Sequence, residues 1–272
     1  MRMRAVFALL AFGTFVLAVT RAGAAGSNGI VPPAISQAID SAVESPDRPA
    51  ADRALDAGRH PAQILAFFGI APGMKVADLW AGGGYTTELL ARVVGPTGKV
   101  YSQNGPFPPA FKTAEDAWKA RVAEPGMSNV VELQKSFEDP DNILPVPPES
   151  LDAVIIDMNY HDLVARGYDR SRINAAVFRA LRPGGVYGVI DNSAQPGSGA
   201  RDARTLHRID EAFETAEIEK AGFKLAATSA VLRNPRDDRT WFVMKHRGEQ
   251  DRFVLKFIKP PGAGGIGAGL PH

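Results

Sequence analysis

The sequence predicts an α/β fold built on a mostly parallel sheet with helices on both faces. Short apolar segments of strand length alternate with longer amphipathic segments between about residues 75 and 221, and turns rich in glycine and proline separate them. The chain has 272 residues, 45% of them hydrophobic, which is enough for one domain with a sizeable core. Because a helix between two strands usually makes those strands parallel neighbours, this alternation predicts a parallel sheet with a layer of helices on each face.

The first 24 residues are typical of a secretory signal peptide. Arg2 and Arg4 precede an uncharged apolar run from Ala5 to Thr20, which is shorter than the roughly 20 residues that span a bilayer. The small residues from Ala22 to Ala24 suit signal peptidase. We expect cleavage after Ala24, export to the periplasm or out of the cell, and no stable membrane insertion afterwards. An uncleaved membrane anchor is the alternative.

The composition of the expected mature chain restricts its partners. Removal of residues 1–24 would leave 248 residues with 28 basic and 30 acidic side chains, because three arginines leave with the signal peptide. A net charge near −2 gives no reason to expect nucleic acid as a partner. The chain has no cysteine, which excludes disulfides, a lipid-modified cysteine and thiol catalysis.

Residues 25–60 are expected to hold an N-terminal leader and helices. Helices are predicted at Pro33–Val43 and Ala50–Ala57. Pro61 suits the first position of a further helix, which continues over Ala62–Phe68 and ends at Gly69.

Residues 61–260 carry the alternating elements, and the glycine-rich tail at 261–272 is expected to be disordered. The last two strands have no helix of crossover length between them, so we expect them to be antiparallel neighbours. The expected helices are Tyr85–Val94, Ser171–Leu181 and Asp210–Ala221. The expected strands are Lys75–Leu79, Lys99–Ser102, Val130–Gln134, Ala153–Asp157, Val186–Ile190, Phe223–Leu232 and Phe253–Ile258.

A glycine turn follows the first of these strands, and the segment from Val76 to Leu90 predicts a strand, a turn and a helix start. Ligands of parallel sheets bind beyond the carboxyl ends of the strands, where glycine lets the backbone approach and a helix N-terminus offers free N–H groups. The run Gly82-Gly83-Gly84 has these properties. A dinucleotide fingerprint needs glycine at Thr87, and a Walker loop needs lysine directly after Gly84, so neither motif matches. A plain tight turn is the alternative to a ligand site.

Asp78, Gly82 and Gly84 match an acidic residue followed by x-Gly-x-Gly-x-Gly. By this motif the chain resembles the class I S-adenosylmethionine-dependent methyltransferases, and in particular a secreted or periplasmic branch of predicted methyltransferases. The resemblance runs from about Pro46 to Pro260. The segments that suggest this branch are Asp56-Ala57-Gly58-Arg59-His60-Pro61, Gly82-Gly83-Gly84-Tyr85-Thr86-Thr87-Glu88, Asn159-Tyr160-His161-Asp162, Thr205-Leu206-His207-Arg208-Ile209-Asp210 and Asp251-Arg252-Phe253.

The resemblance implies a Rossmann-like doubly wound sheet of about seven strands, mostly parallel with an antiparallel last strand, and S-adenosylmethionine as the cofactor. Two positions depart from the family pattern. Trp80 replaces the first glycine, and we expect its ring to line the pocket. Gln103-Asn104 stands where the family places an acidic residue for the ribose hydroxyls, and an amide lacks the charge-assisted strength of that contact. The residues implied for cofactor binding are Asp78, Trp80, Ala81, Gly82, Gly83, Gly84, Tyr85, Asn104 and Asp157.

Candidate catalytic residues lie between Asp157 and Asp162, at the expected end of the fourth strand. Methyl transfer is a displacement at a sulfonium, which needs alignment and sometimes a base for the proton of the nucleophile. His161 is the candidate base, with Asp162 or Asp157 to orient it, and Tyr160 is expected to orient or cover the substrate. The alternative is a helix start at which Asp162 caps the helix and His161 faces solvent.

Other polar segments have two interpretations each. His207 is a second candidate base, or it closes a loop together with Asp210. Arg59 and His60 form either a lid over the cofactor or a surface segment. Residues 233–239 are expected to be a solvated loop. No metal site is expected, because the five histidines are scattered and form no H-x-x-x-H pair.

The sequence therefore favours a methyltransferase that uses S-adenosylmethionine and acts on a small molecule or an envelope component. The expected export places the chain where this cofactor is not made. The alternative is thus a non-catalytic exported protein that binds a small ligand on the same fold. A nicotinamide-dependent reductase is disfavoured by the missing third glycine.

Overall fold

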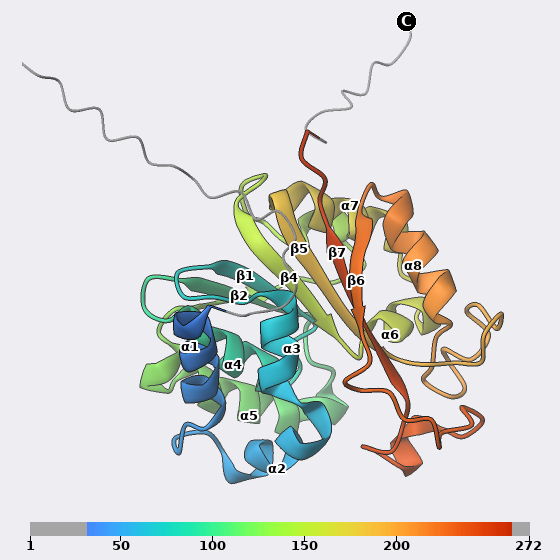
Figure 1. Cartoon of the computed structure of the whole chain (residues 1–272), viewed down its shortest axis with the longest axis horizontal. Coiled ribbons are helices and arrows are strands. Elements are labelled where there is room, and N and C mark those ends of the chain that lie inside the picture. The colour runs from blue at the N-terminus through green and yellow to red at the C-terminus, as the bar shows by residue number, and fades with distance from the viewer. Residues whose placement is uncertain (1–31, 263–272) are drawn as a thin grey trace, which may run out of the picture. The chain divides into compact units, whose positions relative to one another are not determined.

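The structure is a computed structural model that describes residues 32–262. The predicted signal peptide and most of the predicted tail lie outside the described residues. Seven strands form one sheet in the order β3-β2-β1-β4-β5-β7-β6 (Figure 1). Five strands run parallel, and β7 is antiparallel to both β5 and β6. The fold class predicted from the sequence is therefore confirmed.

Most strands agree with the predicted segments, but β5 begins at Leu181 and not at Val186, through the Pro183-Gly184-Gly185 segment that was expected to be a turn. The last two strands are antiparallel neighbours as expected. Only β6 is clearly shorter than predicted, because the chain enters a turn at Ala230. The strands are β1 (Lys75–Leu79), β2 (Lys99–Asn104), β3 (Val130–Gln134), β4 (Leu151–Asp157), β5 (Leu181–Asn192), β6 (Lys224–Ser229) and β7 (Arg252–Ile258).

The helices include two that the sequence analysis did not predict, α5 and α6. Helix α5 is mostly polar and buries only Trp118, so it gives a weak periodic signal. The helices are α1 (Pro33–Val43), α2 (Ala50–Arg59), α3 (Pro61–Phe68), α4 (Tyr85–Val94), α5 (Lys112–Val122), α6 (Tyr160–Ala165), α7 (Arg170–Ala180) and α8 (Glu211–Lys220), with 3₁₀ turns η1 (Pro109–Phe111), η2 (Pro125–Met127), η3 (Pro140–Asn142) and η4 (Val243–Lys245).

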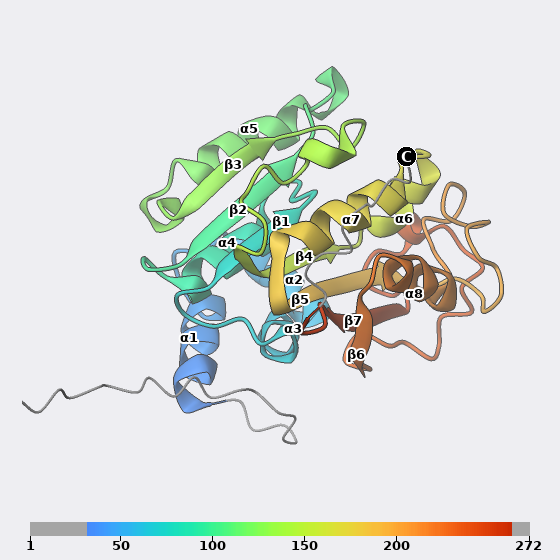
Figure 2. The same ribbon diagram turned by 90° about the horizontal axis from the view of Figure 1, so that it is seen from above.

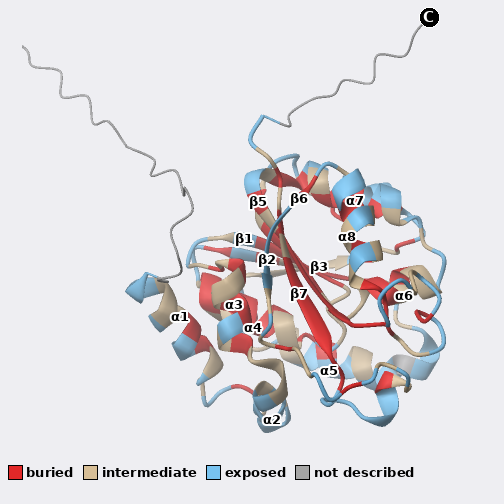
Figure 3. Ribbon diagram, turned by 45° about the vertical axis from the view of Figure 1, so that its right-hand side comes forward, coloured by how far each residue is buried: buried red, intermediate tan, exposed pale blue. Residues whose placement is uncertain are grey.

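Two apolar layers hold the helices to the sheet. On one face, α1, α3 and α4 pack on residues such as Val76, Ile155 and Val254. On the other face, α6, α7 and α8 pack on residues such as Leu79 and Tyr187 (Figure 2). Figure 3 shows that β7 is buried inside the sheet, whereas β6 at the edge is mostly exposed. Among residues 32–262, no helix is long and apolar enough to cross a membrane.

The predicted solvated loop at 233–239 is instead anchored to the core. Arg208 and Asp237 form an ion pair at 2.8 Å, and both side chains are fully buried. Asp251, also buried, accepts hydrogen bonds from the Arg233 side chain and from the backbone N–H of Asn234. The prediction holds for Pro235, Arg236 and Asp238, which are exposed, but it is wrong for Asp237. It used the local mixture of charges, whereas the partner of Asp237 lies far away in the sequence.

The strand order reverses between β1 and β4, which are parallel neighbours. In an open α/β sheet the carboxyl ends of the strands at such a switch point leave a crevice, and ligands bind there. The glycine turn follows β1, and α6 begins three residues after β4 ends. The fold thus brings the two predicted parts of the site to one edge of the sheet.

Candidate active site

The glycine turn, residues 80–84, is fixed by the end of β2. The backbone N–H of Trp80 donates to Gln103 Oε1 at 2.9 Å, and the N–H of Gly82 donates to Asn104 Oδ1 at 2.8 Å. Asn104 Nδ2 donates in return to the Gly82 carbonyl at 3.2 Å. The amide predicted to face a ribose thus holds the turn in place. The Asn104 amide both accepts from the Gly82 N–H and donates to the Gly82 carbonyl, whereas a carboxylate could only accept.

Open space lies beside two of the three glycines. A Cβ on Gly82 or Gly83 would meet no atom within 4 Å, whereas a Cβ on Gly84 would come within 2.6 Å of the Trp118 ring. Gly84, with a φ of 87°, is the N-cap of α4, and no side chain caps this helix. Gly82 and Gly83 therefore leave a cradle next to an uncapped helix N-terminus, which favours a polar or anionic ligand group.

Asp78 lies behind the turn and is buried. It accepts a hydrogen bond from Thr87 Oγ1 at 2.5 Å. Burial, together with the charge of Asp157, raises the pKa of Asp78 to about 7, although the bond from Thr87 opposes this. Asp157 at the end of β4 accepts from Thr86 Oγ1 at 3.0 Å. The two carboxyl groups thus hold the first turn of α4 from the ends of β1 and β4.

The N-terminal helices cover one side of this edge through Tyr85. Its hydroxyl donates to Asp56 Oδ1 at 2.7 Å, and Asp56 forms a bidentate ion pair with Arg48. The guanidinium of Arg59 lies 4.3 Å from the centre of the Tyr85 ring. Arg59 therefore packs on the start of α4 and is not a free surface residue, and a lid over the cofactor stays a prediction.

A small cavity of about 30 Å³ lies under this cover. Its polar lining consists of Arg59, Tyr85, Thr86, Asp157 and Arg252, and the remainder is apolar. Burial lowers the pKa of Arg252, although the charge of Asp157 opposes this. The cavity is large enough for a water-sized group only.

Trp80 turns away from the small cavity and packs in an aromatic cluster. Its ring centre lies 5.1 Å from that of Phe137 and 6.3 Å from that of Tyr168, and the Arg166 guanidinium lies 5.2 Å from the ring. Trp80 also has a φ of 56°, an unusual value for a large side chain. The sequence analysis missed Phe137 and Tyr168, because nothing local to either residue marks it.

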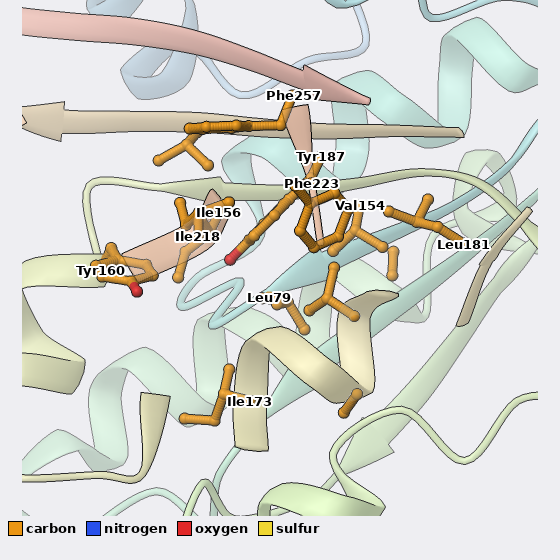
Figure 4. Close-up of a cluster of buried hydrophobic side chains, with 14 of the residues drawn as sticks. Leu79, Val154, Ile156, Tyr160, Ile173, Leu181, Tyr187, Ile218, Phe223 and Phe257 are labelled. Carbon is orange, nitrogen blue, oxygen red and sulfur yellow. The ribbon is translucent and has the colours of Figure 1, made fainter. Parts of the chain in front are cut away.

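Tyr160 belongs to the core and not to a binding surface. Its side chain is fully buried in the apolar cluster that Figure 4 shows. Its hydroxyl accepts from Asn174 Nδ2 at 2.9 Å and donates to Glu217 Oε2 at 3.2 Å. The expectation that Tyr160 orients or covers the substrate is wrong for this geometry, because no part of the ring is accessible.

His161 is oriented by a residue other than the two expected. Its Nδ1 lies 2.6 Å from Asp191 Oδ1, and its backbone N–H donates to Asp191 Oδ2 at 2.7 Å. Asp157 contacts Thr86 instead, and Asp162 Oδ1 is 3.8 Å from His161 Nε2. The helix-cap alternative is also wrong, since Asn159 is the N-cap of α6 and His161 is buried.

His207 meets His161 across the loop that follows β5. His161 Nε2 and His207 Nδ1 are 3.1 Å apart, and Asp162 Oδ1 lies 3.5 Å from the latter atom. Burial opposes protonation of His161, but Asp191 outweighs it, so the pKa of His161 is raised. Burial and the neighbouring His161 lower the pKa of His207. The pair thus separates into a more basic inner imidazole and a less basic outer one.

Of the expected loop closure by His207 and Asp210, only the Asp210 part is confirmed. Asp210 accepts from the backbone N–H of Ala212 at the start of α8 and from that of Gly197. The expectation of no metal site rested on sequence spacing, but the structure brings metal-binding atoms of His161, Asp162 and His207 within 4.8 Å of one another. Sequence spacing could not indicate it, since the two histidines are 46 positions apart.

Comparisons with known proteins agree with this architecture. No family model matches the chain. The arsenite methyltransferase of Halobacterium salinarum is 29% identical over 191 residues, which cover 68% of this chain and 45% of that protein. The ubiquinone/menaquinone biosynthesis C-methyltransferase UbiE of Cronobacter sakazakii is 26% identical over 165 residues, which cover 59% of this chain and 61% of that protein. The chain thus spans about half the length of these curated relatives.

A solved structure has the same arrangement of elements. A SAM-dependent methyltransferase from Aquifex aeolicus superposes with a TM-score of 0.55 at 19% sequence identity, over 80% of this chain and 97% of that one. The chain therefore has the Rossmann-like fold of the class I methyltransferases. Both sequence relatives are methyltransferases by name.

Proposed function

We propose that the protein transfers a methyl group from S-adenosylmethionine to a small-molecule or envelope-component acceptor. The observation that carries the proposal is the open cradle at Gly82 and Gly83, at the switch point of a methyltransferase-like sheet. Sequence similarity to two proteins named as methyltransferases, although at low identity, adds support.

The residues at the cradle fit the cofactor chemically. Backbone without Cβ atoms and the uncapped start of α4 suit the nucleoside and its polar groups. Asp157 at the end of β4 offers a negative charge to the ammonium of the amino-acid end. When bound, the cofactor supplies an electrophilic methyl carbon on a sulfonium. The proposed binding set is Ala81, Gly82, Gly83, Gly84, Tyr85 and Asp157, whereas Asp78, Trp80 and Asn104 of the expected set hold the turn or α4 in place or pack beside the turn.

The proposed acceptor side is the cluster of His161, Asp162 and His207. Asp191 acts through His161 as a positioning residue, because it fixes the imidazole at both Nδ1 and the backbone N–H. Asp162 and His207 are only partly buried, with 22% and 32% of their side chains exposed, so an acceptor can reach them. This cluster is proposed to orient the acceptor and to remove the proton of its nucleophilic atom.

A second candidate function is a non-catalytic exported protein that binds a small ligand in the same cradle. The hydrogen bonds of Asn104 favour this second function, because both of its amide atoms pair with Gly82. No carboxylate stands at the end of β2 to hold a ribose. The predicted signal peptide adds support, because export separates the chain from the site where S-adenosylmethionine is made.

Calorimetry on the purified protein separates these functions. We expect S-adenosylmethionine or its demethylated product to bind with a dissociation constant below about 100 µM, which corresponds to roughly 5.5 kcal/mol. If a folded sample binds neither compound at millimolar concentration, the methyltransferase proposal should be abandoned. Binding without transfer of labelled methyl to any envelope or small-molecule fraction would favour the second function.

A further inference from the structure

Three metal-binding atoms meet at the acceptor side, from segments far apart in the sequence. His161 and Asp162 lie in the first turn of α6, and His207 lies in the loop between β5 and α8. The three atoms are His161 Nε2, His207 Nδ1 and Asp162 Oδ1. Two imidazoles and a carboxylate form a common set of protein ligands for zinc.

The distances between these atoms fit a tetrahedral ion. They are 3.1 Å between the two nitrogens, 3.5 Å from Asp162 to His207 and 3.8 Å from Asp162 to His161. Ligand atoms about 2.1 Å from a tetrahedral ion are separated by about 3.4 Å, close to the mean of these three distances. Three facial ligands of an octahedral ion would be only about 3.0 Å apart. The circle through the three atoms has a radius of about 2.0 Å, as a tetrahedral face requires.

Asp191 orients one of the ligands. Because its carboxylate lies 2.6 Å from Nδ1 of His161, that nitrogen carries the hydrogen, and Nε2 presents its lone pair to the other two ligands. A carboxylate behind a histidine ligand is the usual outer-shell support of a zinc site. Asp191 is fully buried, so this support is built into the core.

The backbone and the exposure of the ligands also suit a metal site. His207 has a φ of 54°, a left-handed conformation that is strained for a non-glycine residue. Such strain persists where surrounding contacts fix it, and it presents Nδ1 to His161 here. The side chains become more exposed from His161 (3%) to Asp162 (22%) and His207 (32%), so the site opens toward solvent.

We infer that His161 Nε2, His207 Nδ1 and Asp162 Oδ1 bind a zinc-like divalent cation whose fourth position is open to solvent. This inference does not depend on the proposed methyl transfer. The competing arrangement is a hydrogen bond in which His207 Nδ1–H donates to His161 Nε2, with no metal. In the metal-bound form the two imidazoles cannot act as the base proposed above, because their lone pairs lie on the ion. An oxygen ligand in the fourth position would instead lose its proton more readily, which suits an acceptor hydroxyl.

The test measures zinc and cobalt binding to the purified protein without a histidine tag. After dialysis against a chelator, competition with a chromophoric chelator should give about one zinc ion per chain. Cobalt should give the intense visible absorption of a tetrahedral site. His207→Ala and Asp162→Asn should each weaken zinc binding by more than about 100-fold, and Asp191→Asn by roughly 10- to 100-fold. His246→Ala, which removes a histidine that is 53% exposed and outside the cluster, should change nothing.

Each outcome decides the inference. Circular dichroism and thermal unfolding of the metal-free variants establish that His207→Ala and Asp162→Asn are folded. These two residues are partly exposed, so their replacement removes little packing. The inference is overturned if the wild type binds no stoichiometric zinc, or if both variants keep wild-type affinity. Because the measurement uses no cofactor, it stands even if S-adenosylmethionine does not bind.

Discussion

Gly83→Val is the sharpest test of the cofactor cradle, because the structure separates its effect on binding from its effect on folding. Gly83 does not adopt the left-handed conformation that Gly82 and Gly84 have, and a Cβ there meets no atom within 4 Å. Valine should therefore fold without clash or backbone strain. Gly84 is unsuitable for this purpose, because its Cβ would strike the Trp118 ring at 2.6 Å.

The expected magnitude follows from the space that valine would fill. A glycine replaced at a compatible backbone position changes stability by less than about 1 kcal/mol. A ligand that lies against the backbone at Gly83 would meet the new methyl groups, and overpacking of this kind costs about 1 to 3 kcal/mol. The dissociation constant for S-adenosylmethionine should then rise about 5- to 150-fold.

Calorimetric titration and urea unfolding of the same samples provide the assay. Gly126→Val is the matched control, because its Cβ also has space, with the nearest atom, on Arg92, at 3.8 Å. Gly126 lies in η2, before β3, and thus at the opposite edge of the sheet from the glycine turn. Unchanged affinity in a folded Gly83→Val protein would show that the ligand does not lie against the turn.

Two further predictions concern buried charges. Burial, followed by acidic neighbours, raises the pKa of the Glu214 carboxyl, whose two oxygens have no partner among the described residues. The folded protein therefore binds a proton at Glu214 more tightly than the unfolded chain does. The stability that depends on this protonated carboxyl is complete below its unfolded pKa and is lost as pH rises through its folded pKa. Glu214→Gln should therefore be more stable than wild type, and the difference in unfolding free energy should grow by about 1.4 kcal/mol per pH unit above about pH 4.5. Urea unfolding at pH 5, 6 and 7 measures this difference. A difference that is constant over these pH values would contradict the prediction. Asp237→Asn should cost roughly 3 to 5 kcal/mol in the same assay, because it leaves the buried Arg208 unpaired, whereas Asp141→Asn on the surface should cost far less.

The elements of the fold could be predicted because their signals are local. The helix Tyr85–Val94 and the strands Lys75–Leu79 and Val130–Gln134 have the predicted bounds, since glycine and proline punctuate them and apolar spacing marks their buried faces. Helix α5 was missed because it buries a single side chain. The insertion of β7 between β5 and β6 could not be predicted, because strand order depends on pairing and not on the strand sequences.

The site was predicted only in part, because only some of its features have local signals in the sequence. The glycine turn was found from its composition, and all five segments that carry the family resemblance contribute a residue to the same edge of the sheet. These residues are Arg59, Tyr85, His161, His207 and Arg252. The sequence did not reveal that Tyr160 faces the core while the adjacent His161 reaches Asp191. Adjacent helical positions point in directions about 100° apart, so that distinction depends on how α6 lies on the sheet.

The sequence by itself determined the alternation of strands and helices, the glycine turn and the candidate status of His161 and His207. Each of these is a property of residue type and short-range spacing. Only the tertiary structure decided that the two imidazoles meet 3.1 Å apart and that Asp191 orients one of them. It also decided that Asn104 holds Gly82. Contacts of this kind form when parallel strands bring their carboxyl ends to one edge, and no local pattern specifies which side chains then meet.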